Sequence, residues 1–595
     1  MSGIGGFVGY GESAHIAAQI CNDMEEALKS RGADTHGTYI SKEMCLIHTK
    51  HNRLAEGRQP VRAVFGLKAY VLVFDGELYN NEELRKELNT LGFRFQDYSD
   101  AAVALHGYMA WGQSCVERFN GVFAFAVWDE SGLFIARDRL GIRPLYYSVG
   151  SYGLVFASTV KAILAHPKIK PIIGEEGIVE LIMLGPGRSP GCGTFKTIKE
   201  LAPGECAYYK SELNTNTYWR LKTKIHQDSL AHTIETVRSL IADAVKRQTS
   251  KGGRIASLLS GGLDSSVITT LSRVRDSFSV DYVGNDRFFM SNEFQPEEDR
   301  EFIEIMASFL RLNHRQVLLG SDELADALTD AMIARGYPGM ADVDAALLLL
   351  LRRVSENFDI ALSGEGADEI FGGYPWYQDE DKLFADTFPW AQNVEYRAKF
   401  IKPGLIKSPV DYVQNRFQRA IMSASTLYDD DKTGQRVRQM FNLNLGWFMQ
   451  TLSSRSDAMS AAVNVSVRMP FLDYRLVEYM YNVPWEYKNH ENREKGLMRE
   501  ALKGLLPEKV LERKKSPFPK THNPGYTRRM QDMLKVLLSD SNAPIFDIVS
   551  KKALADLLNE NNVNWYGQLM AYPQTIAYFI QVNAWMKEFN VKTES

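Results

Sequence analysis

Hydrophobic residues gather in short uninterrupted runs over the first 200 residues. Residues 70–74 (YVLVF) lead into an Asp-Gly pair, and residues 121–128 (GVFAFAVW) and 133–136 (LFIA) are separated by four turn-forming residues. Apolar runs of this length between turn residues predict buried β-strands, the last two as a hairpin. Amphipathic stretches at residues 82–91 and 101–111 predict helices beside them. The expected arrangement is strands layered between helices.

The pattern changes after a polar segment at residues 204–225. Short apolar runs then alternate with helical stretches, which predicts parallel strands joined by helices. The expected strands are residues 255–259 and 278–282, and the expected helices are residues 229–246, 265–273 and 297–309. Beyond about residue 376 the pattern is mostly helical and predicts no further strand. We therefore expect two domains, residues 1–215 and residues 225–595, the second with a helical C-terminal part.

Composition excludes several classes of protein. The 595 residues are 45% hydrophobic and 24% charged, which is ordinary for a globular chain and excludes disorder. The net charge of −4 gives no overall attraction to nucleic acid or to an anionic membrane. The N-terminus lacks the features of a signal peptide, and the longest apolar run, residues 345–351, is far shorter than the roughly 18 residues that span a bilayer. A cytoplasmic protein is expected.

Cysteine spacing points to the same compartment. No two cysteines form a CxxC pair, and no cysteine follows residue 206. This spacing excludes a disulfide scaffold and a zinc ribbon, and it suits a reducing environment. The five cysteines are Cys21, Cys45, Cys115, Cys192 and Cys206.

A glycine turn joins a predicted buried strand to a helix at residues 258–266 (LLSGGLDSS). Gly261 and Gly262 allow positive φ and a close approach of the backbone to a ligand. The helix start offers N–H groups and a positive dipole end to an anion, and Ser260 and Ser265 add hydroxyl donors. No Gly-Lys-Ser/Thr follows, so this is not a Walker loop. A phosphate-binding loop is indicated; the alternative is a glycine turn with a polar helix cap.

A second glycine turn, at residues 361–374 (ALSGEGADEIFGGY), also follows a predicted strand. Glu365, Asp368 and Glu369 fall within five residues, and these carboxylates repel one another unless a metal ion or a base role uses them. A solvated acidic loop is the alternative.

These segments together resemble a known family. The first loop resembles the pyrophosphate loop of the ATP pyrophosphatases, and the second resembles the signature of the asparagine synthetase family. Residues 467–473 (VRMPFLD) and 513–518 (RKKSPF) are similar to two further family segments in the same order, so the resemblance covers essentially the whole chain.

The resemblance implies an enzyme that activates a carboxylate with ATP and Mg²⁺ as an acyl-adenylate, from which ammonia displaces AMP to form an amide. Its second domain is expected to be a parallel α/β ATP-pyrophosphatase domain. Lys515 would neutralise departing pyrophosphate, although a solvated basic run is the alternative. The residues implied for the phosphates are Ser260, Gly261, Gly262, Asp264 and Ser265, those for the nucleotide are Leu258, Val280 and Gly364, and those for Mg²⁺ are Asp264 and Asp368.

Glu365 is the candidate general base for the ammonium formed when ammonia attacks. Relatives that close β-lactams carry tyrosine at this position, so Glu365 indicates the ammonia-using branch. Two alternatives stay open: a cyclase that forms an intramolecular amide, and a non-catalytic scaffold or regulatory homologue. The acid is not readable from the expected substrate loop, residues 336–344, and aspartate is the default. The expected partners are a small carboxylic acid and ammonia or another amine, with a homodimer left open.

The first domain resembles a class II glutamine amidotransferase, an N-terminal-nucleophile hydrolase fold with an αββα sandwich. That chemistry needs a cysteine directly after the initiator methionine, and this chain has Ser2. The family's Asn-Gly-Glu turn reads Asp75, Gly76 and Glu77, and an ionised Asp75 cannot donate a hydrogen bond to an oxyanion.

A third departure concerns the arginine that grips the glutamine carboxylate. It aligns best with Lys50, in the segment 47–54, and lysine cannot form the bidentate fork. Asp100, which would hold the glutamine amine, is present. His48 and His51, three residues apart, lack an evident third ligand for a metal site. We therefore expect a glutaminase-silent first domain.

Overall fold

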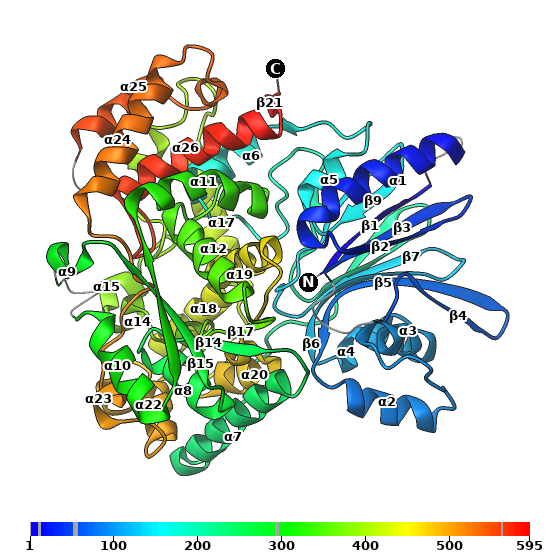
Figure 1. The fold of residues 1–595 in the computed structure, drawn as a ribbon, viewed down its shortest axis with the longest axis horizontal. Helices are drawn as coiled ribbons and strands as arrows, with labels where there is room; N and C mark the ends of the chain where they lie inside the picture. Colours follow the sequence, from blue (N-terminus) through cyan, green and yellow to red (C-terminus); the bar gives the residue numbers. More distant parts are fainter. Residues whose placement is uncertain are drawn as a thin grey trace.

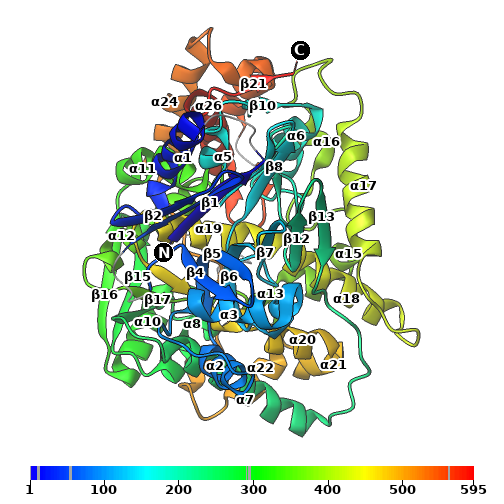
Figure 2. The ribbon, with the colours of Figure 1, turned by 90° about the vertical axis from the view of Figure 1, so that its right-hand side faces the viewer.

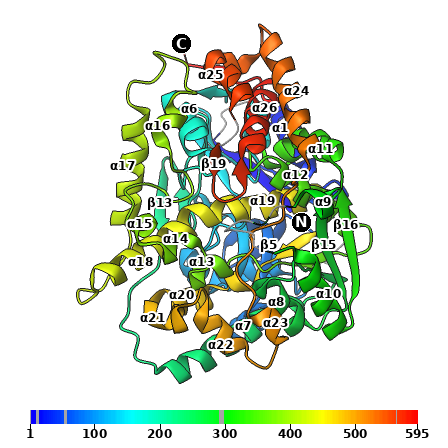
Figure 3. The ribbon, with the colours of Figure 1, turned by 90° about the vertical axis from the view of Figure 1, so that its left-hand side faces the viewer.

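The computed structural model describes residues 2–9, 14–51, 57–289, 291, 297–560 and 563–594. The N-terminal domain lies on the right of Figure 1 and the larger C-terminal domain on the left. Figures 2 and 3 show the same two parts from the two sides. No helix in the described ranges is both long enough and apolar enough to cross a membrane.

Two six-stranded antiparallel sheets form the centre of the N-terminal domain. Ile4 and Leu46 of one sheet pack against Val73 and Ile135 of the other. The first sheet has the order β11 (Lys199–Glu200), β8 (Tyr146–Gly150), β9 (Gly153–Ala157), β1 (Ser2–Val8), β3 (Met44–Lys50) and β2 (Thr35–Ile40). The second has the order β13 (Leu213–Thr217), β12 (Glu205–Tyr209), β7 (Leu133–Arg137), β6 (Gly121–Trp128), β5 (Lys68–Leu78) and β4 (Val61–Phe65).

Helices cover the outer face of each sheet, so the expected αββα sandwich is confirmed. Along β3, Met44 and Leu46 face the second sheet while Cys45 and Ile47 face a helix, as the period of a strand requires. The helices of the first sheet are α1 (Ala14–Leu28) and α5 (Val160–Leu164), and those of the second are α2 (Asn81–Thr90), α3 (Asp100–Trp111) and α4 (Cys115–Arg118).

Strand β5 corrects one prediction. The strand does not end at Asp75-Gly76 but continues to Leu78, with Gly76 paired to Phe123 of β6. Gly76 has φ +147°, and a Cβ at this position would come within 2.0 Å of the Val122 carbonyl oxygen. The glycine therefore serves close strand packing inside the sheet rather than a turn.

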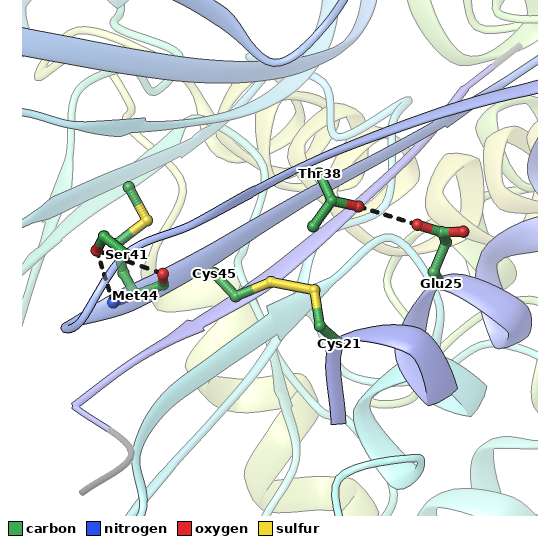
Figure 4. Close-up of a disulfide and its surroundings, with 6 residues drawn as sticks. All are labelled: Cys21, Glu25, Thr38, Ser41, Met44 and Cys45. Atoms are coloured by element: carbon green, nitrogen blue, oxygen red, sulfur yellow. Dashed lines mark hydrogen bonds between the residues drawn. A yellow bond between two sulfur atoms is a disulfide. The ribbon is translucent and has the colours of Figure 1, made fainter. Parts of the chain in front are cut away.

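A disulfide joins Cys21 of α1 to Cys45 of β3, a pairing that the sequence did not predict (Figure 4). The Thr38 hydroxyl also donates a 2.9 Å hydrogen bond to Glu25, which ties the same helix to β2. Cys115, Cys192 and Cys206 carry free thiols.

The C-terminal domain is built on a five-stranded parallel sheet, which confirms its fold class. The prediction of no strand beyond residue 376 is wrong, because β18 forms one edge of this sheet. Three residues are too few to produce a periodic signal, and pairing with β17 is what makes β18 a strand. The order is β16 (Asn313–Leu319), β15 (Asp276–Tyr282), β14 (Ile255–Leu258), β17 (Ile360–Leu362) and β18 (Ser466–Arg468).

Helices pack around this sheet and make up most of the rest of the chain, as expected. Those around the sheet are α7 (Leu230–Thr249), α8 (Leu263–Ser272), α9 (Asn285–Phe288), α10 (Asp299–Leu310), α11 (Ser321–Arg335), α12 (Asp342–Ser355) and α13 (Ala367–Phe371). Those that follow are α14 (Pro375–Gln378), α15 (Glu380–Leu383), α16 (Val394–Ala398), α17 (Pro409–Met422), α18 (Lys432–Leu443), α19 (Met449–Ala462), α20 (Tyr474–Asn482), α21 (Trp485–Lys488), α22 (Gly496–Leu502), α23 (Glu508–Leu511), α24 (Pro524–Ser539), α25 (Lys551–Asp556) and α26 (Tyr572–Glu588).

Helix α19 and the C-terminus connect the two domains. Helix α19 crosses the middle of the molecule in Figures 1 and 3 and contacts α11, α12 and β18, as well as η1 (Lys29–Arg31) of the N-terminal domain. Near the C-terminus, β21 (Lys592–Thr593) pairs with β10 (Ile172–Ile173). A short hairpin, β19 (Asn564–Tyr566) and β20 (Met570–Ala571), precedes α26.

Candidate active site

One cavity of about 210 Å³ lies at the carboxyl ends of β14 and β17. In chain order the strands run 3-2-1-4-5, so this is the point where the strand order reverses, which is where open α/β sheets bind ligands. Most of the expected site residues meet here. Leu258, Ser260, Gly262, Asp264, Ser265, Val280, Gly364, Glu365, Asp368 and Lys515 all line this cavity.

Side-chain hydroxyls fix the shape of the β14–α8 loop. Ser265 Oγ accepts a 3.1 Å hydrogen bond from the Ser260 amide and lies 3.0 Å from Ser260 Oγ. Gly261 is not among the described residues that line the cavity. It has φ +69°, and a Cβ at this position would come within 2.7 Å of Phe302 on α10. Gly261 thus shapes the loop, while Gly262 caps the N-terminus of α8 beside the cavity.

The two glycine loops touch each other at Gly364. A Cβ on Gly364 would lie 2.8 Å from the backbone of Asp264 and Ser265. No larger residue permits this approach, which brings Asp264 and Asp368 to opposite sides of one small space. Sequence order alone, with about 100 residues between the loops, could not show this contact.

A lysine that the sequence did not single out occupies that space. Lys495 Nζ lies 2.7 Å from both oxygens of Asp264 and 2.5 Å from Asp368 Oδ1, and Lys515 Nζ contacts the other oxygen of Asp368. Burial acts against the charge of Lys495, but Asp264 and Asp368 outweigh burial and raise its pKa. Burial likewise opposes the charge of Asp368, yet Lys495 and Lys515 lower its pKa. Burial raises the pKa of Asp264, so the pKa values of the two carboxylates of the cluster shift in opposite directions.

Asp264 and Asp368 offer a donor set that fits Mg²⁺. Their carboxylate oxygens are the hard ligands that this ion takes, and both reach the point where Lys495 Nζ lies. Next to them, the hydroxyls of the β14–α8 loop and the N-terminus of α8 offer donors suited to phosphate oxygens. The end of the cavity at Asp264, Asp368 and the β14–α8 loop thus suits both a nucleoside triphosphate and its metal ion.

Glu365 faces the cavity and is held from behind by α19. Ser456 Oγ donates a 2.5 Å hydrogen bond to Glu365 Oε2, and Arg455 forms an ion pair with Oε1. The side chain of Glu365 is 19% exposed, whereas that of Arg455 is 3% exposed. Neither Arg455 nor Ser456 was predicted, because no short motif marks them and they lie about 90 residues from Glu365 in the sequence.

Glu369, the third carboxylate of this loop, points elsewhere. It is 1% exposed and accepts a 2.6 Å hydrogen bond from the Tyr374 hydroxyl. Burial, together with the nearby charge of Asp368, raises the pKa of Glu369 to about 7. The acidic loop therefore divides into two cavity-facing carboxylates and one buried group.

In the N-terminal domain, Ser2 lies beside Lys50 and Asp75. Ser2 on β1 pairs with Lys50 on β3, and the Ser2 amide donates a 3.3 Å hydrogen bond to Asp75 Oδ1. Arg31 lies against both, with Nη2 3.0 Å from Asp75 Oδ2 and Nε donating to the Ser2 carbonyl at 3.1 Å. Arg53, in the segment where the family's arginine was sought, lies outside the described residues.

The remaining two expected glutaminase carboxylates are paired with the C-terminal domain. Lys251 Nζ lies 2.6 Å from both oxygens of Asp100. Arg468 Nε lies 2.8 Å from Glu77 Oε2, and Ser466 Oγ donates to Glu77 Oε1 at 2.8 Å. Asp100, which was expected to hold the glutamine amine, is therefore paired with a lysine of the α7–β14 loop, and Glu77 is paired with an arginine of β18.

Asp457 on α19 makes a third link between the domains. Arg31 donates to both of its oxygens, at 2.6 and 3.1 Å, and Arg143 donates to Oδ1 at 2.7 Å. Burial opposes the charge of Asp457, but these two guanidinium groups outweigh it and lower the pKa. Asp457 follows Ser456 directly, so adjacent residues of one helix hold Glu365 and the N-terminal domain.

Replacing Asp457 with alanine should destabilise the protein by about 3–5 kcal/mol, because Arg31 and Arg143 lose a buried counter-charge. Thermal unfolding and limited proteolysis between the domains would measure this. The matched control is Asp330→Ala, which breaks an exposed ion pair with Arg352 and should change stability by less than about 1 kcal/mol. Equal losses of stability in the two variants would show that Asp457 contributes no more to stability than an exposed ion pair does.

Comparisons with known proteins show which family the chain resembles over its whole length. The family model described as asparagine synthase matches residues 236–587, and the one described as glutamine amidotransferase domain matches residues 1–219. Asparagine synthetase [glutamine-hydrolyzing] 3 of Bacillus subtilis (strain 168) is 39% identical, over 99% of both chains. Asparagine synthetase [glutamine-hydrolyzing] 1 of the same organism is 24% identical, over 93% of both.

Solved structures give only a weak likeness. Glutamine phosphoribosylpyrophosphate amidotransferase from B. subtilis, complexed with ADP and GMP, is 15% identical and has a TM-score of 0.29 over 45% of this chain and 62% of its own. That likeness is too low to bear on function.

The chain is therefore a two-domain ligase of the kind that forms C–N bonds with ATP. It belongs to the asparagine synthetase family, as its full-length similarity and both family models show. The predictions of family, fold class and enzyme class are confirmed.

Proposed function

We propose that this ligase joins ammonia to a carboxylic acid through an acyl-adenylate. The carboxylate oxygen attacks the α-phosphorus of ATP, the α–β P–O bond breaks, and pyrophosphate leaves. The nitrogen of ammonia then attacks the acyl carbon, AMP leaves with the electron pair of the C–O bond, and the nitrogen loses a proton. The observation that carries the proposal is the single cavity that holds both the Asp264–Lys495–Asp368 cluster and Glu365.

The phosphates belong at the charged end of this cavity. The hydroxyls of Ser260 and Ser265 and the N-terminus of α8 would bind phosphate oxygens, while Leu258 and Val280 line the nucleotide. Lys495 and Lys515 would move from the two aspartates toward the departing pyrophosphate. Mg²⁺, held by Asp264 and Asp368, would supply charge neutralisation to the same oxygens.

Glu365 belongs with the second step. Its carboxylate is fixed by Arg455 and Ser456 while it still faces the cavity, so a free lone pair can take a proton from the ammonium group that forms when ammonia attacks. A positioned base of this kind contributes roughly 10²–10⁴ to a rate.

Free ammonia is the proposed nitrogen source, although the relatives' names describe glutamine-hydrolysing enzymes. Ser2 replaces the required thiol, and Asp75 presents a carboxylate bound to Arg31 where an oxyanion needs a donor. Losing one oxyanion donor alone costs about 10²–10³ in rate.

The domain boundaries at residues 1–215 and 225–595, and a cytoplasmic location, are also part of this proposal.

Ammonium salts should support amide formation, and glutamine should not. Amide and glutamate would be measured together, with ammonium or glutamine as the only nitrogen source. The double variant Ser2→Cys/Asp75→Asn is assayed alongside, since it restores the thiol and the amide donor. Glutamate release by the unmodified protein at the rate of amide formation would overturn this assignment.

The same assay separates the two alternative functions. A cyclase would release pyrophosphate and form product with no added amine, and a scaffold would release no pyrophosphate at all. The lined cavity and its Asp264–Lys495–Asp368 cluster favour an active enzyme over a scaffold.

A further inference from the structure

A second cavity, also of about 210 Å³, lies between the two domains; we call it the interdomain cavity. The N-terminal domain lines it with the end of α1, with η1, and with the segments around β8 and α5. The C-terminal domain lines it with the end of α11 and with α19. No described residue lines both this cavity and the candidate active site. The interdomain cavity is therefore a separate space, to which the proposed function assigns no role.

Helix α19 stands between the two cavities. The side chains that it gives to each are Ser454, Asp457 and Ala458 for the interdomain cavity, and Leu452, Arg455 and Ser456 for the active-site cavity. With 3.6 residues per turn, these two sets point in directions about 160° apart around the helix axis. A small molecule bound in one cavity therefore does not occupy the other.

Cations outnumber acids on the walls of the interdomain cavity. Five cationic side chains line it, against the two carboxylates of Glu26 and Asp457. The cations are Arg31, Arg137, Lys161, Arg188 and Arg335. An excess of positive charge in a cleft attracts anions.

Four of the five cations already have a carboxylate partner. The pairs are Arg31 with Asp75 and Asp457, Arg137 with Glu200, Lys161 with Glu588, and Arg335 with Asp344. The two acids of the lining are likewise matched, since Asp457 also binds Arg143 and Glu26 pairs with Lys29. Arg188 is the cation that remains.

Arg188 has no carboxylate partner in the described part of the chain, and it keeps donors that are open to the cavity. It is half-buried, in the loop at residues 185–192 (GPGRSPGC). Nη1 donates to the Cys192 carbonyl at 3.3 Å and Nη2 to the Tyr146 hydroxyl at 3.5 Å, which uses two of the five N–H groups of a guanidinium. No nitrogen of Arg188 is among the fully buried, unpartnered polar atoms of the described residues. The other N–H groups are therefore accessible to a ligand.

Tyr337 holds this guanidinium in a fixed orientation. Arg188 Cζ lies 3.8 Å from the centre of the Tyr337 ring. Tyr337 is itself 1% exposed, and its hydroxyl donates a 2.7 Å hydrogen bond to the Gly193 carbonyl. A guanidinium stacked on a ring presents its N–H groups sideways, as a fork that matches two oxygens of a carboxylate or phosphate. Arg188 is thus a preorganised donor for an oxyanion.

Other donors come from η1 and α5. Ser30 is exposed, and Thr159 Oγ1 accepts a 3.2 Å hydrogen bond from the Ala162 amide, which leaves its own proton for a ligand. Lys161 is 52% exposed, and its pair with Glu588 is solvent-exposed and therefore weak, so that an anion can compete for its Nζ. Apolar walls are supplied by Ile142, Pro144, Ile333, Ala334 and Ala458.

We propose that the interdomain cavity binds a small organic oxyanion, a carboxylate or a phosphate monoester. Two of its oxygens are held by Arg188, Thr159 and Lys161 supply further donors, and its body packs against the apolar walls. This site goes beyond the proposed function and does not rest on it, because it requires neither adenylation nor amide formation. Since both domains supply walls, the bound anion stabilises the folded two-domain protein.

Binding to the full chain tests this site, with the active site filled by Mg²⁺ and a non-hydrolysable ATP analogue. The probes are glycerol 3-phosphate, inorganic phosphate, butyrate and acetate, with 1-butanol as the uncharged control. We expect saturable binding of at least one anion in calorimetry, a matching rise in Tm, and no binding of 1-butanol. Tighter binding of the phosphates or of the carboxylates identifies which of the two the site takes. No saturable binding of any anion by either method would overturn the inference.

Two variants locate the bound anion. Arg188→Gln removes the charge and the fork, so affinity should fall by about tenfold or more, as expected for lost hydrogen bonds to a charged group. Ser30→Glu, at an exposed position of the lining, covers the case in which Arg188→Gln does not fold; it brings a carboxylate to the cavity and should weaken binding similarly.

The matched control is Arg287→Gln, at an arginine that is 82% exposed and outside both described linings. It should leave the affinity for the anion unchanged. Unchanged affinity in Ser30→Glu and in folded Arg188→Gln would show that the anion binds elsewhere, and would overturn the assignment.

Discussion

Replacing Glu365 with glutamine leaves pyrophosphate release from ATP and acid intact and slows amide formation by about 10²–10⁴. Adenylation removes no proton from an amine, whereas attack by ammonia does. Glutamine keeps the length of the side chain, with its carbonyl oxygen able to face Arg455 and its amide nitrogen able to face the Ser456 hydroxyl. The substitution therefore removes basicity with little change of shape.

Single-turnover pyrophosphate release, with and without ammonium, followed by detection of amide, measures both steps. Glu369→Gln is the matched control because it changes a carboxyl of the same loop that does not line the cavity. Equal loss in both steps of Glu365→Gln would make Glu365 a scaffold of the glycine loop. Unchanged amide formation would remove it from the mechanism.

Asp368→Asn should reduce pyrophosphate release by about 10²–10³, the rate loss typical of removing one preorganised electrostatic contribution to a departing group. Asparagine cannot balance Lys495 and Lys515, and it is a poorer ligand for Mg²⁺ than a carboxylate. Both effects act on the step in which pyrophosphate leaves.

The measurement is pyrophosphate release over a range of Mg²⁺ concentrations. The control is Asp276→Asn, on β15 and outside the described cavity lining, which removes an ion pair with Arg315 on β16. Activity equal to that of the unmodified protein at limiting Mg²⁺ would show that Asp368 neither binds the ion nor orders the two lysines.

Local motifs account for what could be predicted of the site. The loop from Ser260 to Ser265 and the loop from Gly364 to Asp368 each place strand, turn and helix start within a few residues, so their chemistry is visible in a short window. Residues on distant segments could not be predicted in this way. Lys495 precedes α22 with no distinguishing neighbours, and Arg455 and Ser456 belong to a helix whose sequence marks no special position.

The strands, too, could be predicted only where the signal lies within a short stretch of sequence. Long apolar runs such as residues 121–128 predicted strands correctly, since hydrophobic periodicity is a local property. Strand β18 and the continuation of β5 through Gly76 depend on neighbours elsewhere in the chain. The ion pair of Asp100 with Lys251 joins residues about 150 positions apart, and only the tertiary structure brings them together.

The ion pairs across the domain interface bear on whether the second domain could be encoded without the first. A gene shortened to the ligase half would encode a protein in which Lys251, Arg468 and Asp457 lose the partners Asp100, Glu77 and Arg31. The first domain thus supplies the counter-charges of three side chains of the second, whatever becomes of its reactivity. Substitutions at the glutaminase residues that spare these pairs leave the interface charges balanced, whereas loss of the whole first domain leaves three charges of the second without partners.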